Sequence, residues 1–245
     1  MITLADIKGG LYRRLVQAPA QSRVWRELDN RIPDFLPHVE QMKAVGALGA
    51  RSQPWPAIDL VRTIDLINPR SYLEYGSGCS TGVFASFAKS DESIRVESVE
   101  EDPDWASFTR DSLAAAGLLG RNVTVSVAPR QESAEGVSYA FDVQGEPDLV
   151  LVDGPRVRRI NGVQPPCLDI LSILAAGKRP KAIVVDARHA TVDAINDSMF
   201  ISDYLFCASD MYRIRSTKRF VSTGNIGFRL YKESVFVRRD LGLAK

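Results

Sequence analysis

The stretch LEYGSGCST, residues 73–81, contains residue types that can bind a small ligand. Gly76 and Gly78 lack a Cβ, so the main chain there can adopt positive φ and approach a ligand closely. The N–H groups of a helix that begins near Ser80 and Thr81 would attract a carboxylate or phosphate. The alternative is a tight turn without a ligand, in which Ser80 is only the helix N-cap.

An acidic stretch, VESVEED, follows this turn at residues 96–102. Glu100 comes twenty-four positions after Gly76 and ends a predicted strand. Nucleotide-binding folds place an acid at about this distance, where it accepts hydrogen bonds from the ribose hydroxyls. Glu101 is the reserve candidate for this role. The alternative is a solvated charge at the end of a strand.

Two further strands are predicted to end in an aspartate, Asp153 in PDLVLVDGPRVRR and Asp186 in KAIVVDARHA. The carboxyl ends of parallel strands face the ligand crevice of an open α/β sheet. Asp153 is therefore well placed to orient a substrate or to accept a proton, and a turn or N-cap aspartate is the structural alternative.

His189 and Arg156 are the remaining candidates for chemistry. His189 follows Asp186 closely, and a histidine titrates near neutral pH, which suits removal of a proton from a hydroxyl; the alternative is a structural histidine at a helix start. Arg156, with the arginines at 158 and 159, could hold an anionic substrate through paired N–H donors, or could belong to a solvated basic loop.

The elements that must position these residues alternate along the chain. From Ser71 onward, short β-rich runs alternate with helical runs, which predicts a doubly wound, mostly parallel α/β sheet. Residues 1–69 read as a helical extension and 70–245 as the main domain. The runs 212–221 and 225–233, joined by STG, predict an antiparallel hairpin that closes the sheet. Residues 128–146 are expected to form a long loop, a common place for a binding lid.

Composition limits the classes of partner. The 245 residues include 31 basic and 30 acidic side chains, so no whole-molecule field would gather nucleic acid or an anionic membrane. The three cysteines lack a CxxC spacing, so we expect neither a disulfide framework nor a cysteine zinc site. No secretory signal or membrane span is recognised, which favours a cytoplasmic protein with a small-molecule substrate. The oligomeric state is left open, with a homo-oligomer among the alternatives.

The residues quoted above resemble the motifs of the class I S-adenosylmethionine-dependent methyltransferases, which have a Rossmann-like fold. LEYGSGCST is similar to their E/D-x-G-x-G motif, and VESVEED to their acidic second motif. The likeness covers about residues 70–232. Two positions differ, since Ser80 stands in place of the third glycine and the third strand ends in Ala128 instead of an acid.

The resemblance implies specific roles for these residues. Glu74 and Gly76 would hold the amino group of the methionine part of S-adenosylmethionine, and Glu100 its ribose. The segment Ser77, Gly78, Ser80 and Thr81 would hold its carboxylate. Asp153 would lie beside the methyl donor, and Gln131 or Glu132 would recognise the adenine.

The resemblance also implies a reaction, methylation of a small polar or anionic acceptor, most readily at oxygen. The alternative is a catalytically silent binding module or partner subunit. A nicotinamide oxidoreductase is less favoured, because the β-branched Thr81 would crowd the contact that the dinucleotide fingerprint requires. Asp153 and Asp186 also resemble the metal-binding acids of catechol-type relatives, but Ala187 replaces an asparagine ligand, so we expect no metal ligands and treat a divalent metal as the less favoured alternative.

Overall fold

The computed structural model describes residues 18–46, 54–156, 164–186, 188–208 and 233–241. Its N-terminal part is helical, as predicted for residues 1–69, of which residues 1–17 and 47–53 lie outside the described residues. A break at Pro33 divides the first long run, because proline lacks the N–H that would continue the helical hydrogen bonds. The helices are α2 (Ala18–Arg31), α3 (Phe35–Ala44) and α4 (Trp55–Ile67).

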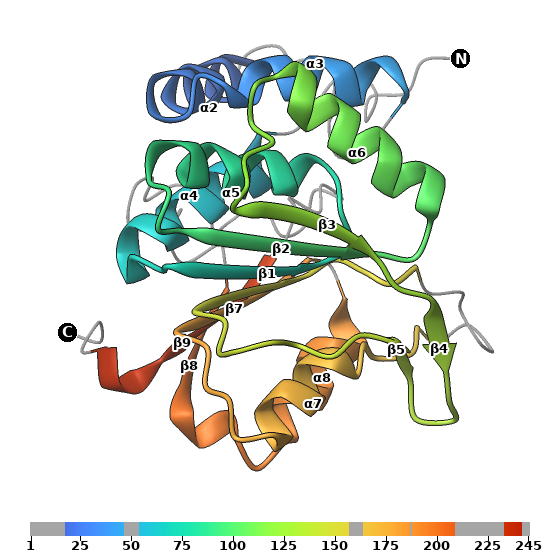
Figure 1. Cartoon of the computed structure of the whole chain (residues 1–245). Coiled ribbons are helices and arrows are strands. Elements are labelled where there is room, and N and C mark those ends of the chain that lie inside the picture. Colours follow the sequence, from blue (N-terminus) through green and yellow to red (C-terminus); the bar gives the residue numbers. More distant parts are fainter. Residues whose placement is uncertain (1–17, 47–53, 157–163, 187, 209–232, 242–245) are drawn as a thin grey trace, which may run out of the picture.

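A seven-stranded sheet forms the centre of the described structure, in the order β3-β2-β1-β6-β7-β9-β8 (Figure 1). All neighbours from β3 to β7 pair in parallel, whereas β9 is antiparallel to both β7 and β8. The predicted mostly parallel sheet with an antiparallel C-terminal pair is therefore confirmed. The strands are β1 (Ser71–Tyr75), β2 (Arg95–Glu100), β3 (Val123–Val127), β6 (Leu149–Val152), β7 (Ala182–Asp186), β8 (Tyr204–Ala208) and β9 (Glu233–Arg238).

The described antiparallel pair lies on either side of the predicted hairpin, which itself stays a prediction. β8 and β9 flank the predicted runs 212–221 and 225–233, which lie outside the described residues except for Glu233. Short 3-10 helices precede β8 and follow β9, at Ile201–Asp203 and Arg239–Leu241. The expected long loop at 128–146 is wrong in part. It contains a small antiparallel hairpin of β4 (Arg130–Glu132) and β5 (Val137–Tyr139).

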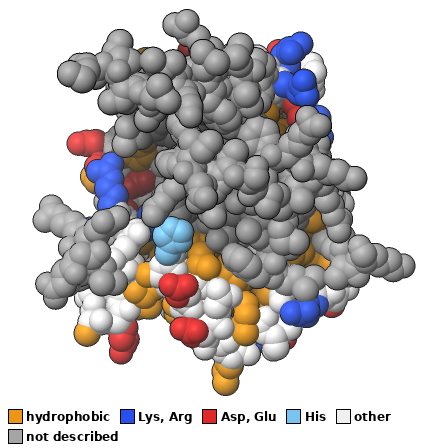
Figure 2. All heavy atoms as spheres, turned by 180° about the vertical axis from the view of Figure 1, so that it is seen from behind, with side chains coloured by type: hydrophobic (Ala, Val, Ile, Leu, Met, Phe, Trp, Pro, Cys, Tyr) orange, Lys and Arg blue, Asp and Glu red, His pale blue; other side chains and the backbone are white. Residues whose placement is uncertain are grey.

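Helices cover both faces of the sheet. Figure 1 shows α4, α5 and α6 on one face and α7 and α8 on the other, while α2 and α3 form an outer layer over the first group. The view from behind shows hydrophobic, acidic and neutral polar side chains intermixed over the lower part that contains α7 and α8 (Figure 2). The bounds are α5 (Cys79–Ser90), α6 (Pro103–Ala115), α7 (Asp169–Ala175) and α8 (His189–Asn196).

The two sides of the sheet have separate hydrophobic cores, and side chains alternate between them. In β6, Leu149 and Leu151 face the α2–α6 core, whereas Val150 and Val152 face the α7–α8 core. Strands buried on both faces read as continuous apolar runs, as this one does. Buried residues of α2 and α3 belong to the same core as the sheet, so the helices before residue 70 pack into one body with it. The boundary at 69/70 stays a prediction.

The carboxyl ends of the central strands lie in register. Tyr75 pairs with Val99 and with Val152, and Val152 pairs with Val185. The next position on each strand therefore forms a row of four residues across the sheet edge: Gly76, Glu100, Asp153 and Asp186. The order of the strands reverses between β1 and β6, and ligands of open α/β sheets bind at such a reversal. Among the described residues, no helix is long and apolar enough to cross a bilayer.

Candidate functional site

The turn after β1 is packed against the turn after β6. Gly76 has a φ of +95°, and a Cβ there would lie 2.6 Å from the backbone nitrogen of Gly154. The Gly154 N–H in turn donates to the Tyr75 carbonyl at 2.5 Å. Glycine is required at position 76 for both its conformation and this close approach. From the sequence, we expected a glycine at position 76 because a ligand approaches the main chain there. The structure adds a second reason, which is the close approach of Gly154 within the protein.

Helix α5 begins at Cys79, with Gly78 at the N-cap position. The Gly78 N–H donates to the Thr81 hydroxyl oxygen at 2.8 Å. The alternative that made Ser80 the N-cap is wrong, because the Ser80 hydroxyl donates to Glu74 instead. The first-turn N–H groups of Cys79, Ser80 and Thr81 have no intrahelical acceptor, as in any α-helix, and attract an anion.

Glu74 is fully buried beneath this helix start. Its carboxyl accepts hydrogen bonds from the hydroxyls of Ser80, Thr81 and Ser98, the last two at 2.5 and 2.7 Å. Removal from water raises its pKa to about 7, although the three hydroxyls lower it in part. The carboxyl therefore joins β1, β2 and α5, and its proposed contact with an amino group stays a prediction.

Glu100 ends β2 and points toward the glycine turn. Its Oε2 accepts from the Ser77 N–H at 3.0 Å and the Ser77 hydroxyl at 3.2 Å, and its Oε1 from the N–H groups of Glu101 and Asp102 at 3.0 and 3.1 Å. Burial raises its pKa. A carboxylate has about four acceptor positions, so a ribose hydroxyl would have to replace the Ser77 hydroxyl. The ribose role stays a prediction.

Glu101, the reserve candidate, connects three loops. Its Oε2 accepts from the Tyr139 hydroxyl at 2.8 Å, and its Oε1 from the Arg156 N–H at 2.9 Å. The Arg156 carbonyl also accepts from Arg130 at 2.7 Å. The backbone of Arg156 is thus fixed while its side chain remains exposed, which leaves the guanidinium available for an anionic group.

Asp153 and Asp186 follow neighbouring parallel strands, about 5 Å apart by strand spacing. Removal from water and the Asp186 charge raise the pKa of Asp153 well above its usual value, and Arg188 lowers it in part. Because Asp153 keeps an exposed surface, water screens part of this effect. Burial also raises the pKa of Asp186, against the charge of Arg188. The pair therefore binds a proton more readily than two separate, solvated aspartates would.

Arg188 was not a sequence candidate, yet it organises this pair. It is 9% exposed, and its guanidinium donates to the carbonyls of Asp153 and of Pro155, the latter at 2.8 Å. A buried cation here fixes the turn after β6 to the turn after β7. Basic residues near strand ends are common, so nothing in the sequence distinguished Arg188 from the arginines at 156, 158 and 159.

The other two candidates lie at the margins of the site. His189 is the first residue of α8 and is exposed, three positions after Asp186. Gln131 is exposed on β4 and pairs in register with Ser138. The adenine role of Gln131 and of the neighbouring, exposed Glu132 stays a prediction, as does the catalytic role of His189.

The donor atoms at the sheet edge decide whether a divalent metal could be held there. Asp186 Oδ1 is buried and has no hydrogen-bond partner within the described part of the chain. However, the described residues contain no group of three histidine, cysteine or acidic side chains that could hold a metal ion. Two adjacent carboxylates supply fewer ligands than Mg²⁺ or Ca²⁺ takes, so the described donor set does not by itself fit a resident metal.

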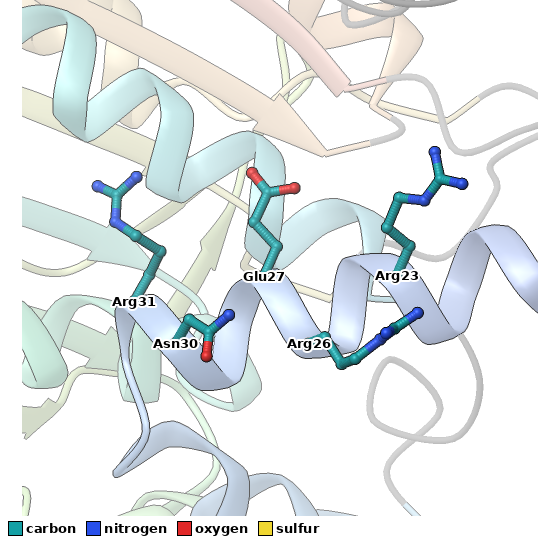
Figure 3. Close-up of a pocket in the computed structure, with 5 residues that line it drawn as sticks. All are labelled: Arg23, Arg26, Glu27, Asn30 and Arg31. Carbon is teal, nitrogen blue, oxygen red and sulfur yellow. The ribbon is translucent and has the colours of Figure 1, made fainter.

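One cavity, of about 530 Å³, lies along α2 and away from the strand ends. Figure 3 shows its charged lining, with Glu27, Arg23 and Arg31 pointing to one side of the helix. Glu27 is paired with Arg62 and Arg31 with Asp65. The cavity is thus a shallow feature of the outer helical layer and not part of the row at the sheet edge.

Comparisons with known proteins support the fold. No family model matches the chain, and no curated protein matches it. Among solved structures, cofactor-bound Rv0187 from MTB has a TM-score of 0.54 at 16% identity, over 98% of this chain and 99% of that one. SAH-bound methyltransferase PaMTH1 from Podospora anserina has 0.55 at 14% identity, over 91% and 96%. A putative O-methyltransferase from Klebsiella pneumoniae has 0.53 at 13% identity, over 84% and 89%. At these identities the likeness shows a shared fold.

Proposed function

We propose that this chain is an S-adenosylmethionine-dependent methyltransferase that acts on a small polar or anionic acceptor, most readily at oxygen. The observation that carries the proposal is the row of Gly76, Glu100, Asp153 and Asp186 at the point where the strand order reverses. Of the similar structures, Rv0187 is cofactor-bound, the methyltransferase PaMTH1 is SAH-bound, and the Klebsiella pneumoniae protein is called a putative O-methyltransferase.

The charges at this edge suit the proposed donor. S-adenosylmethionine carries a positively charged sulfur and an ammonium group, and when bound it supplies an electrophilic methyl group. Glu74, Glu100, Asp153 and Asp186 concentrate acidic groups beside the glycine turn, and their mutual repulsion contributes to raising the pKa of Asp153. A cationic ligand relieves that repulsion, whereas a pyrophosphate would increase it. This favours a sulfonium nucleoside over a dinucleotide.

Asp153 is the residue we assign to proton transfer. Asp153 is an exposed residue at the strand end, and the partial burial of its carboxyl raises its pKa toward the range that suits a general base at neutral pH. In the proposed step, a bound S-adenosylmethionine would supply the methyl group to the acceptor oxygen and would leave as S-adenosylhomocysteine, with the electron pair of the broken sulfur–carbon bond on sulfur. Asp153 would take the proton that the acceptor hydroxyl loses. The exposed Arg156 would hold an anionic part of the acceptor.

Paired titrations test the proposal. Calorimetric titration with S-adenosylhomocysteine and with NAD(H) should give a saturable heat only for the first. Incubation with methyl-labelled S-adenosylmethionine and pooled small-molecule acceptors should then transfer label. Binding of NAD(H) without binding of S-adenosylhomocysteine would refute the cofactor assignment. Cofactor binding without transfer, across broad acceptor pools, would refute the enzyme.

A further inference from the structure

His38 connects the outer helical layer to the glycine turn. It lies on α3, is fully buried, and contacts two other elements. Its Nε2 is 3.1 Å from the Gly78 carbonyl oxygen, and its Nδ1 is 2.8 Å from the hydroxyl of Ser112 on α6. The turn and the histidine are forty positions apart in the sequence, and the three elements meet where α3 packs over α5 and α6 (Figure 1).

The partners of the ring determine its hydrogen-bonding state. A carbonyl oxygen only accepts, so Nε2 must carry the proton and donate to Gly78. Burial lowers the pKa of His38, which keeps the ring neutral, and Nδ1 then accepts from the Ser112 hydroxyl. Both ring nitrogens are therefore used, and Ser112 fixes the tautomer that Gly78 requires.

The structure also provides space for this ring. A Cβ at Gly82, within α5, would lie 2.9 Å from His38 Nε2 and closer still to its Cδ2. Glycine is a poor helix former, and α5 nevertheless has one at the position that faces the ring. Gly82 is best explained by the histidine that occupies the place of its missing side chain.

Because the Gly78–Cys79 peptide group is planar and trans, the direction of the Gly78 carbonyl determines the direction of the Cys79 N–H. The C=O and N–H of one peptide group point in opposite directions. Because the Gly78 carbonyl is held by His38 inside the protein, the Cys79 N–H must point away from α3. Trp105 holds the preceding carbonyl in the same way, through its Nε1 at 2.8 Å from the Ser77 oxygen. Cys79 is the first residue of α5, so its N–H belongs to the group that attracts an anion.

We propose that His38 is a positioning residue, which orients the Gly78–Cys79 peptide so that the Cys79 N–H is presented to the carboxylate of the bound ligand. The identity of that ligand rests on the proposed function above, but the orientation of the peptide does not. The N-terminal helices are then part of the binding site, although no residue of α3 needs to touch the ligand.

Two substitutions of His38 separate positioning from packing. In His38→Gln the side-chain nitrogen can occupy the place of Nε2 and donate to Gly78, whereas the shorter His38→Asn reaches only the place of Nδ1. We expect His38→Asn to weaken S-adenosylhomocysteine binding at least tenfold in calorimetry, and His38→Gln to remain within about threefold of the wild type. Equal affinity of the wild type and the asparagine variant would overturn the proposal.

Hydrogen exchange supplies a measurement that does not depend on the ligand. In the ligand-free protein, His38→Asn should increase amide exchange in peptides covering residues 76–82, and His38→Gln should not. If the wild type fails to bind S-adenosylhomocysteine, the proposed function fails while this comparison still tests the positioning. Unchanged exchange in the asparagine variant would contradict the positioning whatever the ligand is.

Gly82 allows a test from the opposite side. Gly82→Ala should displace the ring, lower the melting temperature and weaken S-adenosylhomocysteine binding. In a His38→Ala background, Gly82→Ala should lower neither the melting temperature nor the affinity for S-adenosylhomocysteine any further, because the methyl group enters the space left by the ring. Ser90→Ala, at the far end of α5, controls for general changes to that helix. Equal effects of Gly82→Ala in both backgrounds would show that Gly82 does not serve His38.

Discussion

Replacing Glu74 by glutamine removes a charge from the most enclosed acidic position of the site. The carboxyl is fully buried and accepts hydrogen bonds from Ser80, Thr81 and Ser98. A glutamine has nearly the same shape and keeps one oxygen acceptor, and the hydroxyls can rotate to meet its amide. The substitution therefore changes ionisation while leaving the packing nearly intact.

The magnitude follows from the pKa. Burial raises the pKa of Glu74 from 4.5 to about 7, and one pKa unit corresponds to about 1.4 kcal/mol, which gives about 3 kcal/mol in all. The folded state binds the proton more tightly than the unfolded chain. The stabilising contribution is thus fully present below pH 4.5 and is lost as the pH rises through about 7.

The assay is urea unfolding of the wild type and of Glu74→Gln from pH 5 to pH 8. The free energy of unfolding of the wild type, minus that of the variant, should fall by about 2 to 3 kcal/mol over this range. Buried acids that do not interact with Glu74 titrate alike in both proteins and cancel in the difference, whereas Glu100 and Asp153 interact with its charge and leave a smaller change of their own. Glu135→Gln, at an exposed position in the β4–β5 hairpin, should show no such trend. A difference that is constant with pH would refute the reasoning.

Three further predictions concern the turns at the sheet edge. Gly76→Ala should lower the free energy of unfolding by about 2 to 4 kcal/mol through backbone strain and overpacking. Gly145 also has a positive φ, but a Cβ there would have no neighbour within 4 Å, so Gly145→Ala should lower the free energy of unfolding by only about 1 to 2 kcal/mol. Equal losses for the two variants on urea unfolding would contradict the close approach of Gly76 to Gly154. Arg188→Met removes the cation that lowers the pKa of Asp153, so the acidic limb of the pH–rate profile should move to higher pH, and an unmoved limb would argue against Asp153 as the base. Asp153→Asn should slow methyl transfer at least about 100-fold while S-adenosylhomocysteine binding stays within a few-fold, and Asp142→Asn, at an exposed position, should leave both unchanged; comparable turnover in the two variants would remove Asp153 from the reaction.

The mostly parallel direction of the strands and the residues at their carboxyl ends were accessible from the sequence, whereas the order of the strands was not predicted. Apolar runs such as LVLV and AIVVD alternate with helical runs, and each strand that faces the reversal point ends in glycine or an acid. Parallel strands align their carboxyl ends, so Asp153 and Asp186 could be placed at the same edge of the sheet, and the pairing of β6 with β7 makes them neighbours. Local pattern and chain direction were sufficient for this part of the prediction.

The contacts of the acidic residues were not accessible in the same way. Glu74 and Glu100 were expected to face a ligand, and the structure surrounds them with the protein's own hydroxyl and N–H groups. The sequence pattern around a carboxylate at a strand end is the same whether its hydrogen-bond donors belong to a ligand or to the protein. Only the path of the neighbouring chain decides which of them reaches the carboxyl.

The sequence by itself determined the class of fold, the glycine turn and the acids at the strand ends, because these depend on local periodicity and on residue type. The tertiary structure decided which groups hold that turn. His38 and Trp105 reach it from distant segments, Arg188 reaches the adjacent turn after β6, and each acts through a backbone carbonyl. A carbonyl is present at every residue, so no sequence pattern can mark the one that a distant side chain will bind.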